Sequence, residues 1–107
     1  MTALVVVTNL PDRGAAEKLA DALIEGHFAA CVNILAPCRS VYRWQGALQH
    51  DEEHPMLIKT TLERYRALEA EIRRHHPYEL PEIIALPVTA GLAAYLDWVG
   101  AETSVAP

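Results

Sequence analysis

The chain has 107 residues, of which 51% are hydrophobic and 21% charged, and its formal net charge is −5 at pH 7. This size and apolar content predict a single folded domain over residues 1–107 and exclude intrinsic disorder. Nucleic-acid binding requires clustered Lys and Arg that neutralise phosphates, so the acidic balance argues against a nucleic-acid partner.

Membrane insertion is also not expected. No apolar run approaches the roughly 20 residues that a bilayer-spanning helix needs, and the N-terminus lacks a basic segment leading into a long apolar core. Cys31 and Cys38 are the only thiols. On one extended strand, about seven steps of roughly 3.3 Å separate them too widely for a disulfide. Two unpaired thiols suit a reducing compartment, so we predict a cytoplasmic protein.

The first part of the chain predicts a strand, a helix and a second extended segment. Residues 3–8 form a short β-branched run without polar alternation, as in a central strand covered on both faces. Asp12 supplies an N-cap for a helix that ends at Gly26. From Ala29 to Trp44 the pattern is extended, and Pro37 should mark a bulge or bend.

A long hairpin follows this extended segment. The Gln45-Gly46 pair predicts a turn, after which the chain returns through residues 56–60 as a second long strand. Pro55 lacks an amide donor, so it is expected where the returning strand is an edge or is bulged.

The last part of the chain predicts a helix, a strand and a short terminal helix. Thr60 and Glu63 have the spacing of a capping box, and Pro77 ends the helix that they begin. Residues 83–88 are a short apolar run typical of a strand, and residues 92–99 predict the final helix.

This order, βαββαβ plus a short C-terminal helix, predicts the α+β class and a ferredoxin-like split β-α-β fold. In that fold two helices pack on one face of an antiparallel sheet. The other face, built from apolar strands, and a hairpin longer than a globule of this size requires predict burial against copies of the same chain.

Catalytic signatures are not found. The sequence has no Gly-rich phosphate loop, Cys-x-x-Cys pair or His-x-x-x-His spacing, so we expect no enzyme. The densest group of polar and aromatic residues is residues 75–82, between the second helix and the last strand. Its His75 and His76 are potential Cu or Zn ligands, but neighbours on a helix point about 100° apart, which favours a single-ligand role.

The rest of this segment indicates a preformed pocket. Two prolines stiffen it, so Tyr78, Glu79 and Glu82 would be presented at little ordering cost. Lys59 lies mid-strand, where a lysine usually pairs with a carboxylate such as Glu79 or Glu82. The alternative is a polar hinge whose side chains satisfy helix-end carbonyls and subunit contacts.

Two hairpin aromatics and one thiol complete the candidate residues. Tyr42 and Trp44 share a strand face, where anchoring a subunit interface is favoured over stacking on a ligand. Cys31 is a weaker candidate metal ligand and is expected first as a small core residue.

Four motifs and a C-terminal segment, in order from about Leu4 to Trp98, resemble the CutA divalent-cation tolerance family. They are Ala29–Ile34 (AACVNI), Ser40–Gly46 (SVYRWQG), Ile58–Thr61 (IKTT), His76–Ile83 (HPYELPEI) and Tyr95–Trp98 (YLDW). The resemblance implies a tight homotrimer in which long hairpins wrap neighbouring subunits and polar clefts lie between them. It implies no reaction and no obligatory cofactor, but tolerance of divalent cations and binding of copper.

The resemblance also implies a ligand set. His75 and His76 match a pair that some members carry before Pro-Tyr, whereas Thr8 stands where those members place a cysteine and is a poor soft-metal ligand. Cys31 is the remaining thiol in this region. The His54-Pro55 pair departs from the apolar residues usual there and should distort the hairpin locally.

Two hypotheses follow. The first is a homotrimeric protein that binds copper or a similar divalent cation weakly and takes part in the response to metal ions. It requires His75 or His76 to be exposed beside a second ligand. The second is a module like the PII signalling proteins, whose trimer the family's resembles, with a small anionic ligand between subunits. It requires Lys59 and Trp98 to line an open cleft.

Overall fold

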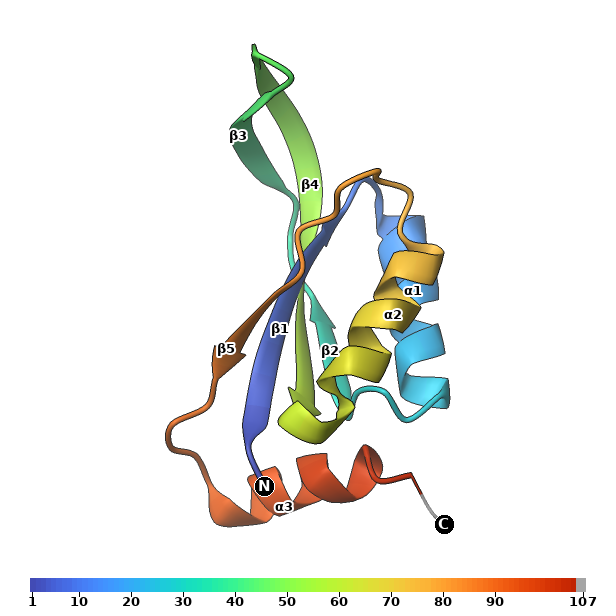
Figure 1. Ribbon diagram of the computed structural model, residues 1–107, viewed down its shortest axis with the longest axis vertical. Coiled ribbons are helices and arrows are strands. Elements are labelled where there is room, and N and C mark those ends of the chain that lie inside the picture. The colour runs from blue at the N-terminus through green and yellow to red at the C-terminus, as the bar shows by residue number, and fades with distance from the viewer. Residues whose placement is uncertain (106–107) are drawn as a thin grey trace.

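The computed structural model describes residues 1–105, so residues 106–107 of the predicted domain lie outside the described part (Figure 1). The elements in chain order are β1 (Ala3–Leu10), α1 (Arg13–Glu25), β2 (Cys31–Ile34), β3 (Cys38–Trp44), β4 (Ala47–Thr61), the 3-10 turn η1 (Leu62–Arg64), α2 (Tyr65–His75), β5 (Ile84–Pro87) and α3 (Ala93–Glu102). No helix within residues 1–105 is both long and apolar enough to cross a membrane.

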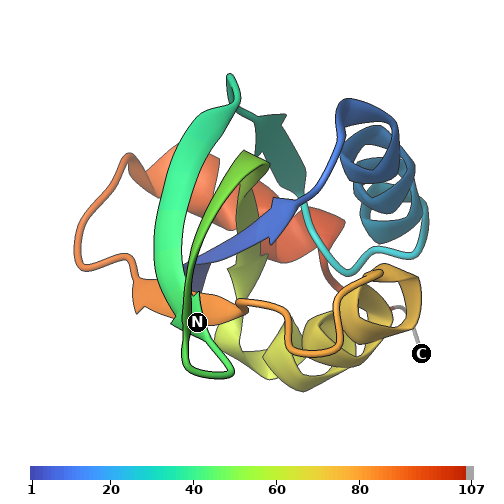
Figure 2. The same ribbon diagram turned by 90° about the horizontal axis from the view of Figure 1, so that it is seen from above.

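The sheet has the predicted ferredoxin-like topology. Its strands run in the order β2-β4-β1-β5, all neighbours are antiparallel, and β3 pairs with the other half of β4. Helices α1 and α2 pack side by side on one face of this sheet, and α3 lies across the end that carries the N-terminus (Figures 1 and 2). The α+β prediction and the helix-covered single face are therefore confirmed.

The hydrophobic core lies between the sheet and the α1–α2 layer. It is built from alternate residues of β1 and β4 and from one stripe on each helix. Its largest fully buried apolar side chains are Val6, Leu10, Leu19, Leu23, Met56, Ile58, Leu68 and Ile72.

The prediction that β1 is covered on both faces is wrong for the single chain. Leu4 and Val6 face the helices and are buried, whereas Val5 and Val7 point the other way and are only half-buried. Strand periodicity places successive side chains on opposite faces, and the helices cover only one of them. The second face of the sheet is thus left apolar and open.

Helix α1 begins as predicted and ends slightly differently. The Asp12 carboxylate accepts a hydrogen bond of 2.7 Å from the Ala15 amide, which confirms the N-cap. Gly26 is the C-cap residue, but its φ of −86° is ordinary, and the left-handed residue is His27 with φ 59°.

The β3–β4 hairpin projects well beyond the rest of the chain (Figure 1). Gln45 and Gly46 have φ of 50° and 80°, the pair of left-handed residues that a two-residue type I′ turn requires. Because of the hairpin the molecule measures 46 × 26 × 22 Å and its radius of gyration is 14.4 Å, against about 13 Å for a globule of this length.

Pro37 and Pro55 lie at and opposite a break in the outgoing strand of the hairpin. The outgoing strand is interrupted between Ile34 and Cys38, at the predicted position of Pro37. Pro55 does not lie at an edge, because β4 is an inner strand, but the predicted alternative of a bulge is confirmed. Ile34 pairs with Met56 and Cys38 with Glu53, so the outgoing strand has one residue more than β4 over this stretch. The Pro55 carbonyl accepts from the Leu35 amide, so its missing N–H faces the interruption and no ladder hydrogen bond is lost there.

The predicted capping box is also wrong. Thr60 is still in β4, where its hydroxyl donates to the Phe28 carbonyl at 2.7 Å. Thr61 occupies the cap position before η1 without a capping side-chain hydrogen bond, and α2 starts only at Tyr65. Tertiary hydrogen bonding has therefore taken the hydroxyl that the local pattern assigned to a helix end.

We expect Thr60→Val to lower the free energy of unfolding by about 1 kcal/mol, because the part-buried Phe28 carbonyl loses its partner. The matched change Thr61→Val removes a neighbouring hydroxyl that makes no capping bond, so its effect should be smaller. Urea denaturation of both variants measures the difference. A larger loss in Thr61→Val would contradict this assignment.

Candidate functional site

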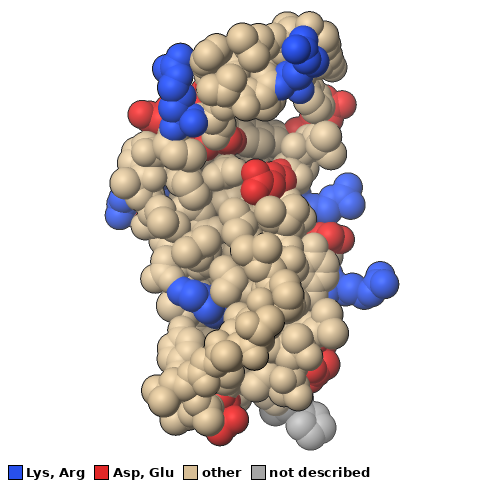
Figure 3. All heavy atoms as spheres, turned by 90° about the vertical axis from the view of Figure 1, so that its left-hand side faces the viewer, with Lys and Arg blue, Asp and Glu red and all other residues tan. Residues whose placement is uncertain are grey.

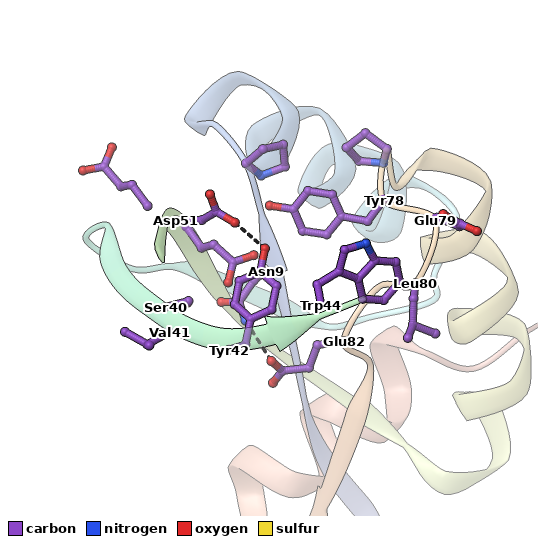
Figure 4. A pocket seen from close by; sticks show the side chains of 14 residues that line it. Asn9, Ser40, Val41, Tyr42, Trp44, Asp51, Tyr78, Glu79, Leu80 and Glu82 are labelled. Atoms are coloured by element: carbon purple, nitrogen blue, oxygen red, sulfur yellow. Dashed lines mark hydrogen bonds between the residues drawn. The ribbon is translucent and has the colours of Figure 1, made fainter. Parts of the chain in front are cut away.

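A cavity of about 820 Å³ opens between the β3–β4 hairpin and the loop that follows α2 (Figure 4). Three aromatic side chains, Tyr42, Trp44 and Tyr78, contribute to its wall. Its volume lies in the range of small-molecule sites in proteins. The sequence predicted a pocket formed by residues 75–82, and the structure adds the hairpin as its opposite wall.

Strand register brings the hairpin side chains onto one face. Ser40 pairs with Asp51, and Cys38 pairs with Glu53. Residues that are paired across an antiparallel ladder point to the same side, and so do residues two apart on one strand. Because Tyr42 lies two residues after Ser40 on β3, one face of the hairpin carries Tyr42, Asp51 and Glu53. This face points toward the cavity on the helix-free side of the sheet.

The cavity is strongly acidic. Five carboxylates are among its lining residues, which include no Lys or Arg within the described chain; they are Asp51, Glu52, Glu53, Glu79 and Glu82. Sequence analysis identified Glu79 and Glu82 but missed the three hairpin carboxylates. The available signal was the acidic run at residues 51–53, between the predicted turn and the returning strand.

The two tyrosines of the cavity donate to these carboxylates. The Tyr42 hydroxyl is hydrogen-bonded to Asp51, and this bond, with burial and the charges of Asp51 and Glu53, raises the pKa of Tyr42. Burial, followed by the hydrogen bond to Glu53 and its charge, raises the pKa of Tyr78 well above its usual value. Both phenols are therefore protonated at neutral pH, and their protons are already engaged.

His76 is a structural support of the cavity loop. Its Nε2 lies 2.7 Å from the Asn9 carbonyl, which only accepts, so Nε2 carries the proton. Its Nδ1 accepts from the Tyr78 amide at 3.2 Å. Only 9% of His76 is exposed, and burial lowers its pKa, opposed by the Asn9 hydrogen bond and the charge of Glu53. Both ring nitrogens are thus occupied within the fold.

A second tie holds the far end of the same loop. The Asn9 side-chain amide donates to the Glu82 carboxylate at 3.0 Å, as drawn in Figure 4. Asn9 therefore contacts the loop at both ends, through its carbonyl to His76 and through its side chain to Glu82. This residue was not identified from sequence, because the contacts join positions far apart in the chain.

His75 has a different environment from its neighbour. Its Nε2 lies 3.1 Å from the Glu71 carboxylate, one turn earlier on α2, and 33% of its side chain is exposed. Arg74 also pairs with Glu71 at 3.1 Å. The sequence signal for this pair is the spacing of Glu71 and His75, which are i and i+4 on a predicted helix.

Lys59 lies away from the cavity. Its ammonium donates to the Asn33 side chain and is 4.0 Å from the Cys31 sulfur. The predicted ion pair with Glu79 or Glu82 is therefore not formed within the single chain. Cross-strand register explains this, because Cys31 lies directly opposite Lys59 on β2.

Trp98 lies on α3 and stacks against Tyr95 at 5.5 Å between ring centroids. It is 42% exposed, and neither it nor Lys59 is among the lining residues of the cavity. Burial is the first cause that raises the pKa of Tyr95, and Cys31 adds to it, so α3 reaches the sheet beside this thiol.

The three predicted metal ligands do not converge within one chain. Cys31 pairs with Lys59, which in turn pairs with Val5 on β1. His76 contacts Asn9 on the same strand, and Asn9 lies about 13 Å from Val5 along β1. No group of three or more His, Cys, Asp or Glu suited to a metal ion occurs among residues 1–105. Thr8, at the position of the expected third ligand, is fully buried and faces the helices.

Comparison with known proteins gives consistent results. The family model for the CutA1 divalent ion tolerance protein matches residues 4–102. The divalent-cation tolerance protein CutA of Thermus thermophilus is 42% identical over 99 residues, which cover 92% of this chain and 96% of that one.

Two solved structures show the same likeness. CutA1 from Oryza sativa has a TM-score of 0.95 at 37% identity, over 99% of this chain and 97% of that one. The periplasmic divalent cation tolerance protein CutA from Archaeoglobus fulgidus has a TM-score of 0.92 at 32% identity, over 95% and 99%.

Proposed function

This chain belongs to the CutA1 family of divalent ion tolerance proteins, and on that premise we propose that it is a homotrimer that binds copper or similar divalent cations weakly. The proposal assigns the metal contact to His75 together with Glu71. The observation that carries it is their 3.1 Å approach on α2, where 33% of the His75 side chain and 14% of the Glu71 side chain are exposed.

The open face of the sheet supports the assembly part of the proposal. Ile84 and Leu86 on β5 are each 51% exposed, in register with the half-buried Val7 and Val5. Figure 3, which views the molecule from this side, shows a middle region with few charged side chains. An apolar surface of this kind is typical of a subunit contact.

The donor set supports weak rather than tight metal binding. One imidazole and one carboxylate supply two ligands, whereas tight Zn or Cu sites use three or four. His76 is left out of the proposed site because both of its nitrogens are hydrogen-bonded. Cys31 is left out because it lies beside Lys59 rather than beside the histidines.

The PII-like alternative receives less support. It places a small anion near Lys59 and Trp98, but neither residue lines the cavity within the described chain. The large cavity is lined by carboxylates and would repel an anion. We therefore assign no anionic ligand and no reaction to the chain.

Localisation in the cytoplasm remains part of the proposal. Cys31 and Cys38 are free thiols, which fit a reducing compartment. The Archaeoglobus fulgidus relative is described as periplasmic. Fractionation of the native host would decide between the two compartments.

We expect His75→Ala to weaken Cu²⁺ binding at least tenfold, because the imidazole is the stronger of the two proposed ligands. Glu71→Gln should weaken it less. Calorimetric titration at pH 7.5 measures both, with native mass spectrometry reporting subunit count and bound metal together. Wild-type binding should also weaken as the pH is lowered to 5.5, because protons compete with the metal for imidazole.

His50→Ala is the matched control for this experiment. His50 is an exposed histidine on β4 whose ring contacts Arg39 rather than a carboxylate. Its loss should leave the affinity unchanged. Wild-type affinity in His75→Ala, or an equal loss in His50→Ala, would refute the assignment to His75.

A further inference from the structure

The chemistry of the large cavity differs from that of the proposed metal contact. It combines flat aromatic surfaces with five carboxylates and includes no cationic side chain among its lining residues in the described chain. The carboxylates do not converge, since no metal-competent group of three forms within residues 1–105. A point charge such as a metal ion would therefore find no complete coordination sphere there.

A planar organic cation fits the same arrangement. Guanidinium offers five N–H donors in a rigid plane that matches carboxylates bidentately, and its face stacks on aromatic rings. The cavity offers both elements, with Tyr42, Trp44 and Tyr78 beside Asp51 and Glu82 (Figure 4). Its volume of about 820 Å³ accommodates such a group on an alkyl chain.

The carboxylates of the wall keep acceptor positions free. The Tyr42 hydroxyl already donates to Asp51, and the Asn9 amide already donates to Glu82. Each carboxylate has lone pairs left after these single bonds, because an ionised carboxylate accepts about four. Glu53, only 9% exposed, adds negative charge at the base of the hairpin wall. These features disfavour anions and leave acceptors for a donor-rich cation.

From these observations we infer that the cavity between the β3–β4 hairpin and residues 77–82 binds an alkylguanidinium group. The inference does not depend on the metal contact at His75 and Glu71, which lies on α2 outside the cavity lining. The guanidinium belongs either to a free small molecule or to an arginine side chain of a neighbouring copy. On the hairpin, Arg39 and Arg43 are exposed, and Arg39 contacts His50 within the chain, so these two residues are the candidates for the second arrangement.

Agmatine is the probe for the free small molecule, and calorimetry on the wild-type assembly is the measurement. Saturable binding is expected, at least fivefold tighter than that of putrescine, which keeps a cationic alkylamine but lacks guanidinium. N-butylurea, a neutral analogue of the guanidine, should not bind. Equal binding of agmatine and putrescine would overturn the inference, because it would show only a negatively charged cavity.

Two isosteric substitutions test the site itself. The double variant Asp51→Asn, Glu82→Gln removes two negative charges. Its side-chain amide oxygens can still accept the hydrogen bonds of Tyr42 and Asn9. Agmatine affinity should fall about tenfold or more in this double variant. In the control, Glu63→Gln with Asp97→Asn, two exposed carboxylates outside the cavity lose the same charge, and affinity should stay within twofold. Equal losses in the two variants would refute the cavity assignment.

A third variant distinguishes the two sources of guanidinium. If an arginine of a neighbouring copy occupies the cavity, Arg39→Gln with Arg43→Gln should bind agmatine at least fivefold more tightly than wild type does. If the ligand is a free molecule, this variant and wild type should bind equally. Absence of agmatine binding in both proteins, with the assembly intact by light scattering, would overturn the inference for either source.

Discussion

Replacing Ile84 and Leu86 together with glutamate is expected to convert the proposed trimer into monomers at micromolar concentration. Both side chains are 51% exposed in the single chain and lie on β5, at the edge of the sheet. In an assembly they would be removed from water, and an unpaired carboxylate in such a contact costs several kcal/mol. Sedimentation velocity and light scattering report the subunit count directly.

The matched control for this prediction is Leu62→Glu. Leu62 is 58% exposed on η1, at the start of the α2 segment and away from β5. This variant should keep the wild-type subunit count. A monomeric wild type would refute the proposed trimer, and an intact trimer in the double variant would show that β5 lies outside the contact.

The second large effect is expected at His76. Changing this residue to Ala should lower the free energy of unfolding by about 2 kcal/mol, because the Asn9 carbonyl and the Tyr78 amide both lose a partner. Chemical denaturation at a fixed protein concentration measures the loss, since assembly makes stability depend on concentration. His75→Ala, on the exposed side of the same helix end, is the control and should cost much less.

His76 should also make stability depend on pH in a defined direction. Burial lowers its pKa in the folded chain, so folding favours the neutral ring. Unfolded histidine titrates near 6.5. Above that pH the contribution of His76 is complete, and as the pH falls below about 6.5 the unfolded state takes up the proton more readily and stability declines, until the folded pKa is passed.

His76→Gln isolates this contribution. The difference in unfolding free energy between wild type and this variant should shrink from pH 7 to pH 5.5, because the remaining histidines are common to both proteins and cancel. A difference that is constant with pH would mean that folding does not favour the neutral form of His76.

Local sequence patterns predicted most of the fold. The hairpin turn at Gln45-Gly46 and the cap at Asp12 follow from backbone preferences that act within a few residues, and the structure confirms both. The capping box at Thr60 was wrong because its hydroxyl is used by the Phe28 carbonyl, which is distant in sequence. Local rules hold wherever no long-range partner competes for the same group.

The candidate site likewise contains residues that local sequence patterns predicted and contacts that they did not. The loop residues Tyr78, Glu79 and Glu82 were predicted from composition and proline stiffening, and they do line the cavity. The partner of Lys59 was not predictable, because it depends on which strand lies beside β4 and in which register. The separate environments of His75 and His76 likewise follow from the point at which α2 ends against β1.

The sequence by itself determined the order of the elements and the family resemblance, since hydrophobic periodicity and motif spacing are properties of the chain alone. Only the tertiary structure decided which charged and hydrogen-bonding groups meet. Glu53 approaches Tyr78, Asn9 holds both ends of the cavity loop, and Lys59 turns to Asn33. These contacts join residues tens of positions apart, and their strength depends on distances and burial that exist only once the sheet has formed.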